Sequence, residues 1–352
     1  MKQGQADGRR LRTVAAMATL LLVSGCANFG YYLQSIGGHF ELNSARQPVE
    51  RLIADPATPD VLKRRLERAA AIRQFASSEL HLPDNGSYRS YADLKRRFVV
   101  WNVFAAGEFS VEARTWCFLF AGCVGYRGYF SKDAADEFAA GLRAEGLDAR
   151  VGGVPAYSTL GWFDDPLLNT FIHYPEYELA RLIFHELAHQ VAYAKGDSEF
   201  NESFAVAVEI EGVDRWIARQ GDAAMRADAA RTRERRGQFA ALVLNARDRL
   251  EKLYRLRIAP EAMRERKAAA FADLQNDYAR LKQAWGGFPG YDAFFDGANN
   301  AHLASVSIYH ALLPAMQRLL VRQGGDFSAF YAEVRRLAAL PKGERDAALA
   351  EP

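Results

Sequence analysis

The stretch His185-Glu186-Leu187-Ala188-His189, followed by Asn201-Glu202, decides how this chain is expected to fold and act. Histidines four residues apart lie about 40° from each other around a helix, so His185 and His189 face the same side. Glu186 lies about 100° from His185, beside that shared direction. The pattern predicts two imidazoles that bind one metal ion and a carboxylate that stays free beside it.

The flanking residues predict that two helices carry these side chains. The segment from Tyr177 to Lys195 contains neither proline nor glycine, and its apolar residues recur at helical spacing. Gly196 follows as a helix stop. A second helix is expected to begin near Glu199, with Asp197 or Ser198 as its N-cap.

An antiparallel return of the second helix brings a third ligand to the metal. His189 then lies roughly 9 Å before the turn and Glu202 roughly 6 Å after it, so the two side chains are at similar height. Asp197 and Glu199 are nearby alternatives to Glu202. The sequence therefore predicts one Zn²⁺ per chain, held by His185, His189 and Glu202.

Glu209 is expected to support the metal site from behind. It lies seven residues beyond Glu202 on the same helical face, and at roughly 16 Å into the helix it comes level with His185. An imidazole that binds zinc usually donates its other N–H to an acceptor, often a carboxylate. Glu211 points to the opposite side and does not qualify.

The motifs H-E-L-A-H-Q and N-E-S-F-A-V-A-V-E resemble those of the glutamate-zincins, which are zinc metallopeptidases. The resemblance implies that His185, His189 and Glu202 bind zinc and that Glu186 is the general base on the water that zinc activates. It also implies that Glu209 contacts a zinc-binding side chain and does not bind the metal itself. Two departures are clear: only 12 residues separate His189 from Glu202, a shorter gap than in the aminopeptidases of that group, and their G-A-M-E-N segment is absent.

From about residue 20 to 335 the chain is more similar to a family of Gram-negative lipoproteins named as aminopeptidases. The segments that carry this resemblance are 115–117, 122–124, 126–131, 156–161 and 299–301. It implies zinc peptidase chemistry on peptide substrates. An aminopeptidase also needs an acidic group for the free amine of its substrate, and Asp164, Asp165 and Glu176 are candidates.

The N-terminus has the pattern of a lipoprotein signal. Residues 1–12 carry four basic residues, an eleven-residue and mostly apolar run follows from Thr13, and Ser24-Gly25-Cys26 completes a lipobox. The run is too short for a permanent membrane helix. We expect cleavage after residue 25, a lipid anchor on Cys26, and a position in the bacterial envelope at the outer membrane, facing the periplasm.

The remaining cysteines and the net charge bear on the compartment of the protein and on its class of partner. Cys117 and Cys123 are expected to form a disulfide in an oxidising compartment, since neither has a histidine or a C-x-x-C partner for metal binding. Residues 1–25 hold four of the 45 basic residues and one of the 43 acidic ones, so the rest has a net charge of about −1. Nothing therefore points to nucleic acid. The oligomeric state cannot be inferred.

The fold class expected is α+β and predominantly helical, resembling a zincin with a small sheet beside the active-site helix and a helical C-terminal half. We expect a tether over residues 26–45 and a catalytic domain over 46–352, divided into 46–222 with the sheet and 223–352 with helices only. The elements expected are strands at 98–104, 115–130 and 149–159, and helices at 59–82, 132–145, 223–257, 262–285 and 300–322.

Two further roles are assigned as hypotheses. Tyr309 is the candidate donor to the oxyanion of the reaction, and His302 lies seven residues earlier on the same helical face. Residues 154–159 are expected to lie along the substrate as a strand. The basic cluster at Arg231, Arg233, Arg235 and Arg236 is interpreted as a solvated helix face.

Two alternatives to an aminopeptidase remain open at this point. One is a zinc endopeptidase in envelope protein quality control. The other is a lipoprotein that binds zinc without catalysis. The free carboxylate of Glu186 speaks against the second alternative, because a purely structural zinc site normally closes its fourth position.

Overall fold

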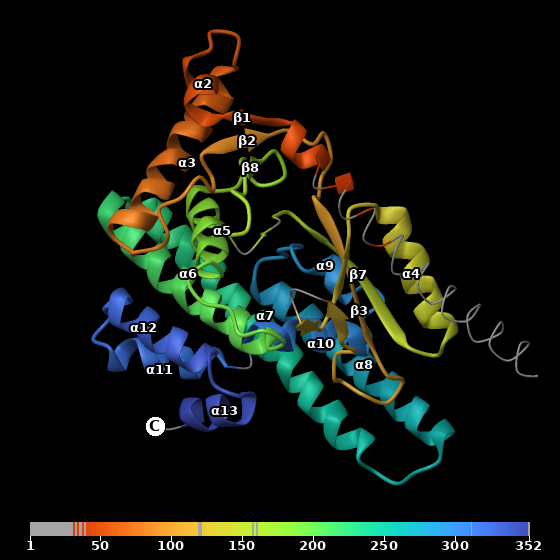
Figure 1. Ribbon diagram of the computed structural model, residues 1–352. Helices are drawn as coiled ribbons and strands as arrows, with labels where there is room; N and C mark the ends of the chain where they lie inside the picture. The colour runs from red at the N-terminus through yellow and green to blue at the C-terminus, as the bar shows by residue number, and fades with distance from the viewer. Residues whose placement is uncertain are drawn as a thin grey trace, which may run out of the picture.

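A computed structural model describes residues 31, 34, 37–38, 40–118, 122–156, 158–159, 161–310 and 312–350. The expected signal segment, Cys26 and part of the expected tether lie outside these residues. The described chain is α+β and predominantly helical, as expected, with three small sheets (Figure 1). Among its helices, none combines the length and the apolar character needed to cross a bilayer.

The strands group into three sheets. One has the order β1-β2-β8, one has the order β6-β3-β7, and β4 pairs with β5 alone. The strands are β1 (Arg46–Pro48), β2 (Ser90–Ala92), β3 (Val100–Ala106), β4 (Trp116–Phe118), β5 (Gly122–Val124), β6 (Arg127–Tyr129), β7 (Asp148–Val154) and β8 (Leu167–Leu168).

The helices in the described part of the chain match most of the expected ones within a few residues. They are α2 (Val49–Ala54), α3 (Asp60–Ser78), α4 (Lys132–Ala144), α5 (Glu176–Ala188), α6 (Ser198–Gln220), α7 (Ala223–Tyr254), α8 (Pro260–Ala284), α9 (Asp292–Phe295), α10 (Asn300–His310), α11 (Leu313–Arg322), α12 (Phe327–Ala338) and α13 (Lys342–Ala350). The helix expected over 300–322 is divided into α10 and α11, with Pro314 in the first turn of α11.

Strand β3 is the centre of an antiparallel sheet with helices on both faces. Val103 and Ala105 point into an apolar cluster with α4, whereas Phe104 packs against α10 on the other face. Because both faces are covered, the strand is a nearly continuous buried run. Val100 and Asn102 share the face of Phe104, as alternate residues of a strand must, and they reach the wall of a cavity described below.

The helical pair of α5 and α6 lies at the middle of the main apolar core. Figure 1 shows the two helices side by side, with α3 next to α5. The core includes Leu179, Ile183 and Leu187 on α5 and Phe204 on α6. The apolar stripe predicted on the motif helix is therefore the buried one.

The β4–β5 hairpin is closed by a disulfide between Cys117 and Cys123, as expected from the cysteine count. Gly122, at its turn, has a φ of +78°, and a Cβ added to it would lie 2.8 Å from the backbone nitrogen of Gly196. Only glycine allows this close approach. The hairpin consequently rests on the loop that follows α5.

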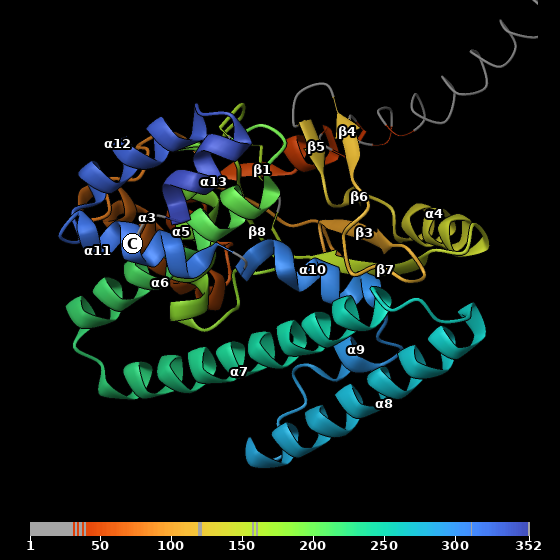
Figure 2. The same cartoon turned by 90° about the horizontal axis from the view of Figure 1, so that it is seen from below.

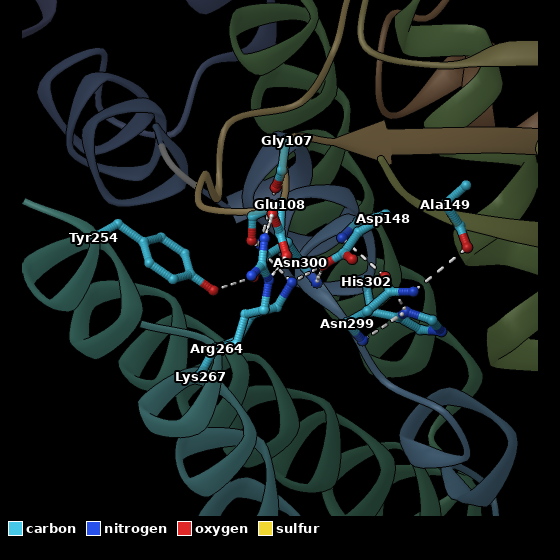
Figure 3. Close-up of polar contacts among 11 residues, drawn as sticks. Gly107, Glu108, Asp148, Ala149, Tyr254, Arg264, Lys267, Asn299, Asn300 and His302 are labelled. Carbon is cyan, nitrogen blue, oxygen red and sulfur yellow. Dashed lines mark hydrogen bonds and ion pairs between the residues drawn. The ribbon is translucent and has the colours of Figure 1, made fainter. Parts of the chain in front are cut away.

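A network of polar contacts fixes the start of α10 against the end of the β3–β7 pair (Figure 3). Lys267 Nζ donates to Asp148 Oδ2 at 2.7 Å and to the Glu108 carbonyl at 2.9 Å. Asp148 Oδ2 also accepts from the Asn300 backbone N–H at 3.0 Å, and the Tyr254 hydroxyl donates to Asn300 Oδ1 at 2.9 Å. The network joins α7, α8 and α10 to the sheet, and so sets the position of Tyr309 further along α10.

The last three helices return to the main core. Their apolar side chains, Phe330 and Val334 among them, pack in the same cluster as α5 and α6. The Arg345 guanidinium of α13 donates to Asp197 Oδ2 at 2.8 Å, at the start of α6. Helices α7, α8 and α9 instead share a separate cluster with residues of α10. The domain division at residue 222 stays a prediction.

Candidate metal centre

Helix α5 ends earlier than the sequence predicts. The prediction of a helix through Lys195 is wrong, because α5 ends at Ala188 with His189 as its C-cap. The Ala194 N–H donates to Asn201 Oδ1 at 2.7 Å, and Asn201 Nδ2 donates to the Ala194 carbonyl at 2.9 Å. This two-way pairing with α6 holds residues 190–195 out of a helix, although no residue in that stretch is a helix breaker.

Helix α6 begins at Ser198, close to the predicted position. Asp197 is its N-cap, and its side chain accepts from the Phe200 N–H at 3.2 Å. The same carboxylate pairs with Arg345, so its oxygens are engaged away from the histidines. In the described part of the chain Asp197 and Glu199 are outside the cluster of potential metal ligands, which consists of His185, His189 and Glu202.

Three donor atoms of this cluster converge on one point. The Nε2 atoms of His185 and His189 are 3.2 Å apart, and Glu202 Oε2 lies 3.3 Å from the first and 3.7 Å from the second. Ligands at about 2.0–2.1 Å from a tetrahedral ion are separated by about 3.3 Å. The three edges therefore fit one small tetrahedral cation.

Glu209 contacts His185 on the far side from the other ligands. Its Oε2 lies 2.9 Å from His185 Nδ1 and accepts from Arg181 Nη1 at 3.0 Å. Arg181 in turn donates to Glu178 Oε2 at 2.8 Å. With Nδ1–H donated to Glu209, Nε2 is the ring nitrogen of His185 that faces a cation, once its own proton is released.

The electrostatics of the cluster favour positive charge at its centre. Burial raises the pKa of Glu202, but the charges and hydrogen bonds of His189 and His185 outweigh it and bring the value to about 2. Burial likewise raises the pKa of Glu209, but Arg181 and His185 lower it to about 2. Burial lowers the pKa of His185, yet its hydrogen bonds to Glu202 and Glu209 raise it to about 10. Two buried carboxylates thus stay ionised around this point.

Two cavities meet beside the cluster. The smaller, about 320 Å³, lies toward the sheet and the disulfide hairpin, and the larger, about 550 Å³, lies between α5, α6 and α7. Glu186 and His185 line both cavities. Glu186 is outside the ligand cluster, so its carboxylate is available to a molecule that bridges the two spaces.

Tyr309 also lines both cavities, from its place on α10. The charge of Glu202 and then burial raise its pKa well above the usual value, so the hydroxyl keeps its proton and can donate a hydrogen bond. His302 does not share this position. Its ring packs edge-on against Phe294, and Nδ1 lies 3.0 Å from Asn299 Oδ1.

Besides Tyr309 and Tyr31, two more tyrosines line the smaller cavity, and the sequence analysis did not single them out as site residues. They are Tyr126, after β5, and Tyr193, in the loop after α5. Burial, followed by the charge of Glu202, raises the pKa of each. Tyr193 was not considered because its segment was expected to continue the motif helix. Tyr126 was named only within a segment that carries the family resemblance. Arg181 was also missed, although it lies four residues before His185 on the same helical face.

The residues expected to lie along the substrate are only partly extended. Strand β7 ends at Val154, so the prediction of a strand through Thr159 is wrong for the described residues beyond it. Pro155 follows and has no N–H for a sheet ladder. Val154 and Ala156 nevertheless line both cavities, so this segment does border the candidate site.

None of the three acids considered for a substrate amine lines either cavity. Glu176 accepts from Trp216 Nε1 at 3.0 Å and pairs with Arg68 at 3.0 Å. Asp165 is 2% exposed and accepts from the Thr159 N–H. Asp164 is in contact with Gly86 instead.

Asp165 predicts a pH-dependent stability. Burial raises its pKa to about 7, against the effect of the Thr159 hydrogen bond. Between about pH 4 and pH 7 the folded protein keeps a proton that the unfolded chain has released, so the free energy of unfolding falls as pH rises through this window. Asp165→Asn, which keeps an acceptor for Thr159, should stabilise the protein by about 2–4 kcal/mol more at pH 8 than at pH 4.

Urea unfolding of both proteins at the two pH values measures this difference. Wild type and Asp165→Asn should be closest in stability at pH 4. If the stability difference were the same at both pH values, the prediction that burial raises the pKa of Asp165 would be wrong.

These features define an α+β protein whose helical pair places two histidines and a glutamate within metal-binding distance, beside a free glutamate and two cavities. The chain belongs to the family described as "Putative aminopeptidase", whose model matches residues 30–349. Comparison with curated proteins and with solved structures found no match. Family membership supports a peptidase-like function.

Proposed function

We propose that the protein is a zinc-dependent peptide hydrolase, and an aminopeptidase as its family name suggests, with one zinc ion held by His185, His189 and Glu202. The observation that carries this proposal is the convergence of two imidazole nitrogens and one carboxylate oxygen, 3.2–3.7 Å apart, beside Glu186. Two histidines and a glutamate are a donor set of catalytic zinc sites, which leave the fourth position to water or substrate.

A zinc ion in this position would lower the pKa of a water molecule and polarise the carbonyl of the peptide bond. Glu186 accepts the proton of that water on its carboxylate and passes it to the leaving amine. Its place on the wall shared by both cavities puts it beside a peptide bond that spans them.

Tyr309 and Glu209 have supporting roles in this proposal. Tyr309 donates a hydrogen bond to the oxyanion, because its hydroxyl stays protonated and the residue lines both cavities. Glu209 accepts Nδ1–H of His185 and so fixes the ring with Nε2 toward the cation. Arg181 holds Glu209 in place.

An endopeptidase is the second candidate, and one observation favours it. Cavities extend on both sides of Glu186, and the three acids considered for the substrate amine lie outside them. A substrate that continues in both directions fits this arrangement. A peptide with an acetylated N-terminus separates the two candidates, because an aminopeptidase needs the free amine.

The experiment that tests the proposal combines metal analysis with hydrolysis. Purified protein should contain about one zinc per chain, and it should cleave peptides until a chelator removes the metal. Zinc added back should restore cleavage. Protein that binds no zinc, or cleavage that a chelator leaves unchanged, would contradict it. Stoichiometric zinc without cleavage of any peptide would favour the non-catalytic alternative.

We further propose that the chain is anchored to the outer membrane by a lipid on Cys26. The support is the lipobox Ser24-Gly25-Cys26 after an apolar run, which is a feature of the sequence alone. Mass spectrometry of the mature N-terminus tests this proposal, and an unmodified cysteine or an uncleaved leader would contradict it.

A further inference from the structure

Helix α7 carries a glycine near its middle that packing does not require. Gly237 lies inside Ala223–Tyr254, where glycine is less favourable than any residue except proline. A Cβ built on Gly237 would have no other heavy atom within 4 Å, apart from its own helix backbone and chain neighbours. Gly237 lines the larger cavity and is exposed, so the space beside it lies on the open side of that cavity.

The larger cavity lies between the α5–α6 pair and α7. Figure 2 shows α7 below α6, with α8 on the outer side of α7. Phe239 and Val243 on α7 belong to the cluster with α8, whereas Ala229, Gly237 and Leu244 line the cavity. One face of α7 is therefore a wall of the cavity and another is its attachment to α8.

Polar contacts hold α7 against the other two walls. The Tyr177 hydroxyl of α5 donates to Asp228 Oδ2 at 2.9 Å. Arg236 Nη2 donates to Glu178 Oε1 at 3.0 Å, which joins α7 to α5 a second time. Arg233 Nη1 donates to Asp214 Oδ2 of α6 at 2.9 Å. Two residues of the basic cluster, Arg233 and Arg236, thus hold α7 against α6 and α5.

The charged side chains of the cavity wall already have partners. Arg236 pairs with Glu178, Arg233 with Asp214, and Arg181 with both Glu178 and Glu209. The rest of the wall is mainly apolar and includes Leu182, Val206, Ile210, Val213, Ala240 and Leu244. Apart from Glu186 at the catalytic end, a ligand in this cavity therefore meets mostly apolar surface.

We propose that this cavity is a specificity pocket for a large apolar side chain next to the scissile bond, and that the missing side chain at Gly237 leaves room for it. The proposal rests on the hydrolase function proposed above. His185, Glu186 and Tyr309 form part of the wall of this pocket, so a side chain inside it belongs to a residue at the bond being cleaved. A volume of about 550 Å³ leaves room for aromatic as well as aliphatic side chains.

A substrate series tests the preference. Peptides that differ only in one residue (Ala, Leu, Phe, Trp, Lys or Asp), placed at the first, the second or a central position, are compared by kcat/KM, and mass spectrometry locates the cleaved bond. Leu, Phe or Trp beside the bond should raise kcat/KM about 10- to 100-fold over Ala, as burial of such side chains predicts. Equal rates across the series, or a preference for Lys or Asp, would overturn the proposal.

The variant Gly237→Phe tests the role of Gly237. We expect the added side chain to occupy part of the open side of the cavity. Replacing glycine in a helix interior favours the helix, so misfolding is not expected. The ratio of kcat/KM for the Phe peptide to that for the Ala peptide should fall at least about tenfold. The control is Gly141→Leu in α4, where an added Cβ also meets no atom within 4 Å and which lies outside the cavity. An unchanged ratio in a folded Gly237→Phe protein would overturn the proposal.

A binding measurement separates this proposal from the hydrolase function. Calorimetry with the Glu186→Gln protein compares the Phe and Ala peptides in the absence of cleavage. The Phe peptide should bind at least about tenfold more tightly, and adding Gly237→Phe should remove that advantage. If wild type cleaves nothing, the hydrolase function fails, yet this comparison still decides whether the pocket binds apolar side chains. Equal affinities would overturn the pocket.

Discussion

Glu186→Gln is expected to lower kcat for peptide cleavage by about 10³-fold or more while the protein keeps its zinc. The amide has nearly the shape of the carboxylate but cannot accept a proton from water, and general-base catalysis typically contributes about 10²- to 10⁴-fold. Because Glu186 is not among the three converging ligands, the metal should stay bound. Steady-state kinetics and metal analysis of the same preparation measure both quantities.

A matched control for this variant is Glu211→Gln. Glu211 lies on α6, pairs with Arg215 at 2.8 Å, and lines neither cavity. It should keep both zinc and activity, so a loss specific to Glu186→Gln cannot be a general effect of removing a glutamate. Cleavage at the wild-type rate in Glu186→Gln would rule out this residue as the base.

Glu202→Ala is expected to weaken zinc binding by more than about 100-fold and to remove activity with it. The substitution deletes one of three donor atoms and leaves two histidines, which do not complete a catalytic zinc site. Glu209→Gln should have a smaller effect, about 10- to 100-fold in metal affinity, because Glu209 only orients His185. Titration of each protein against a zinc buffer measures this order.

Thermal unfolding of the metal-free proteins is the control for both variants. Glu202 and Glu209 are buried, so a loss of folding must be excluded before a loss of affinity is interpreted. A folded Glu202→Ala protein with wild-type zinc affinity would show that a different residue is the third ligand. Equal affinity losses in the two variants would contradict the distinction between a ligand and the residue behind it.

Helical periodicity, together with an antiparallel return of the second helix, was enough to predict that His185, His189, Glu202 and Glu209 meet. His185 and His189 repeat at four residues, and Glu202 and Glu209 repeat at seven, so each pair lies on one face whatever the helix lengths. The contact of Glu209 Oε2 with His185 Nδ1, at 2.9 Å, follows from this helical spacing. Capping preferences predicted a cap at Asp197 or Ser198, and Asp197 is the cap, because local hydrogen bonds decide helix starts.

The end of α5 could not be predicted in this way. Residues 190–195 favour a helix by composition, and only the amide of Asn201, seven residues after Ala194, draws them into a loop. The end of β7 is a milder case, because Pro155 does signal that the ladder stops. Contacts made in the folded state overrode local preference at α5, and Tyr193 came to the site as a result.

The larger cavity could not be predicted from the sequence either, for a different reason. Its walls come mainly from the consecutive helices α5, α6 and α7, with Tyr309 and residues 154–156 from other parts of the chain, and a cavity is a property of how they pack. Gly237 could be noticed as a glycine within a helical pattern, but nothing nearby in the sequence connects it with Glu186, more than 50 residues earlier. The ion pair of Arg236 with Glu178 shows how α7 returns to the site.

The early end of α5 also has an electrostatic consequence. A helix carries a partial negative charge at its C-terminal carbonyl groups and a partial positive charge at its N-terminal N–H groups, and both effects fade within about one turn. Because α5 ends at Ala188, its negative pole lies at the two histidines, whereas a helix through Lys195 would place it roughly 10 Å away. The backbone at the end of α5 thus itself attracts a cation to the two histidines.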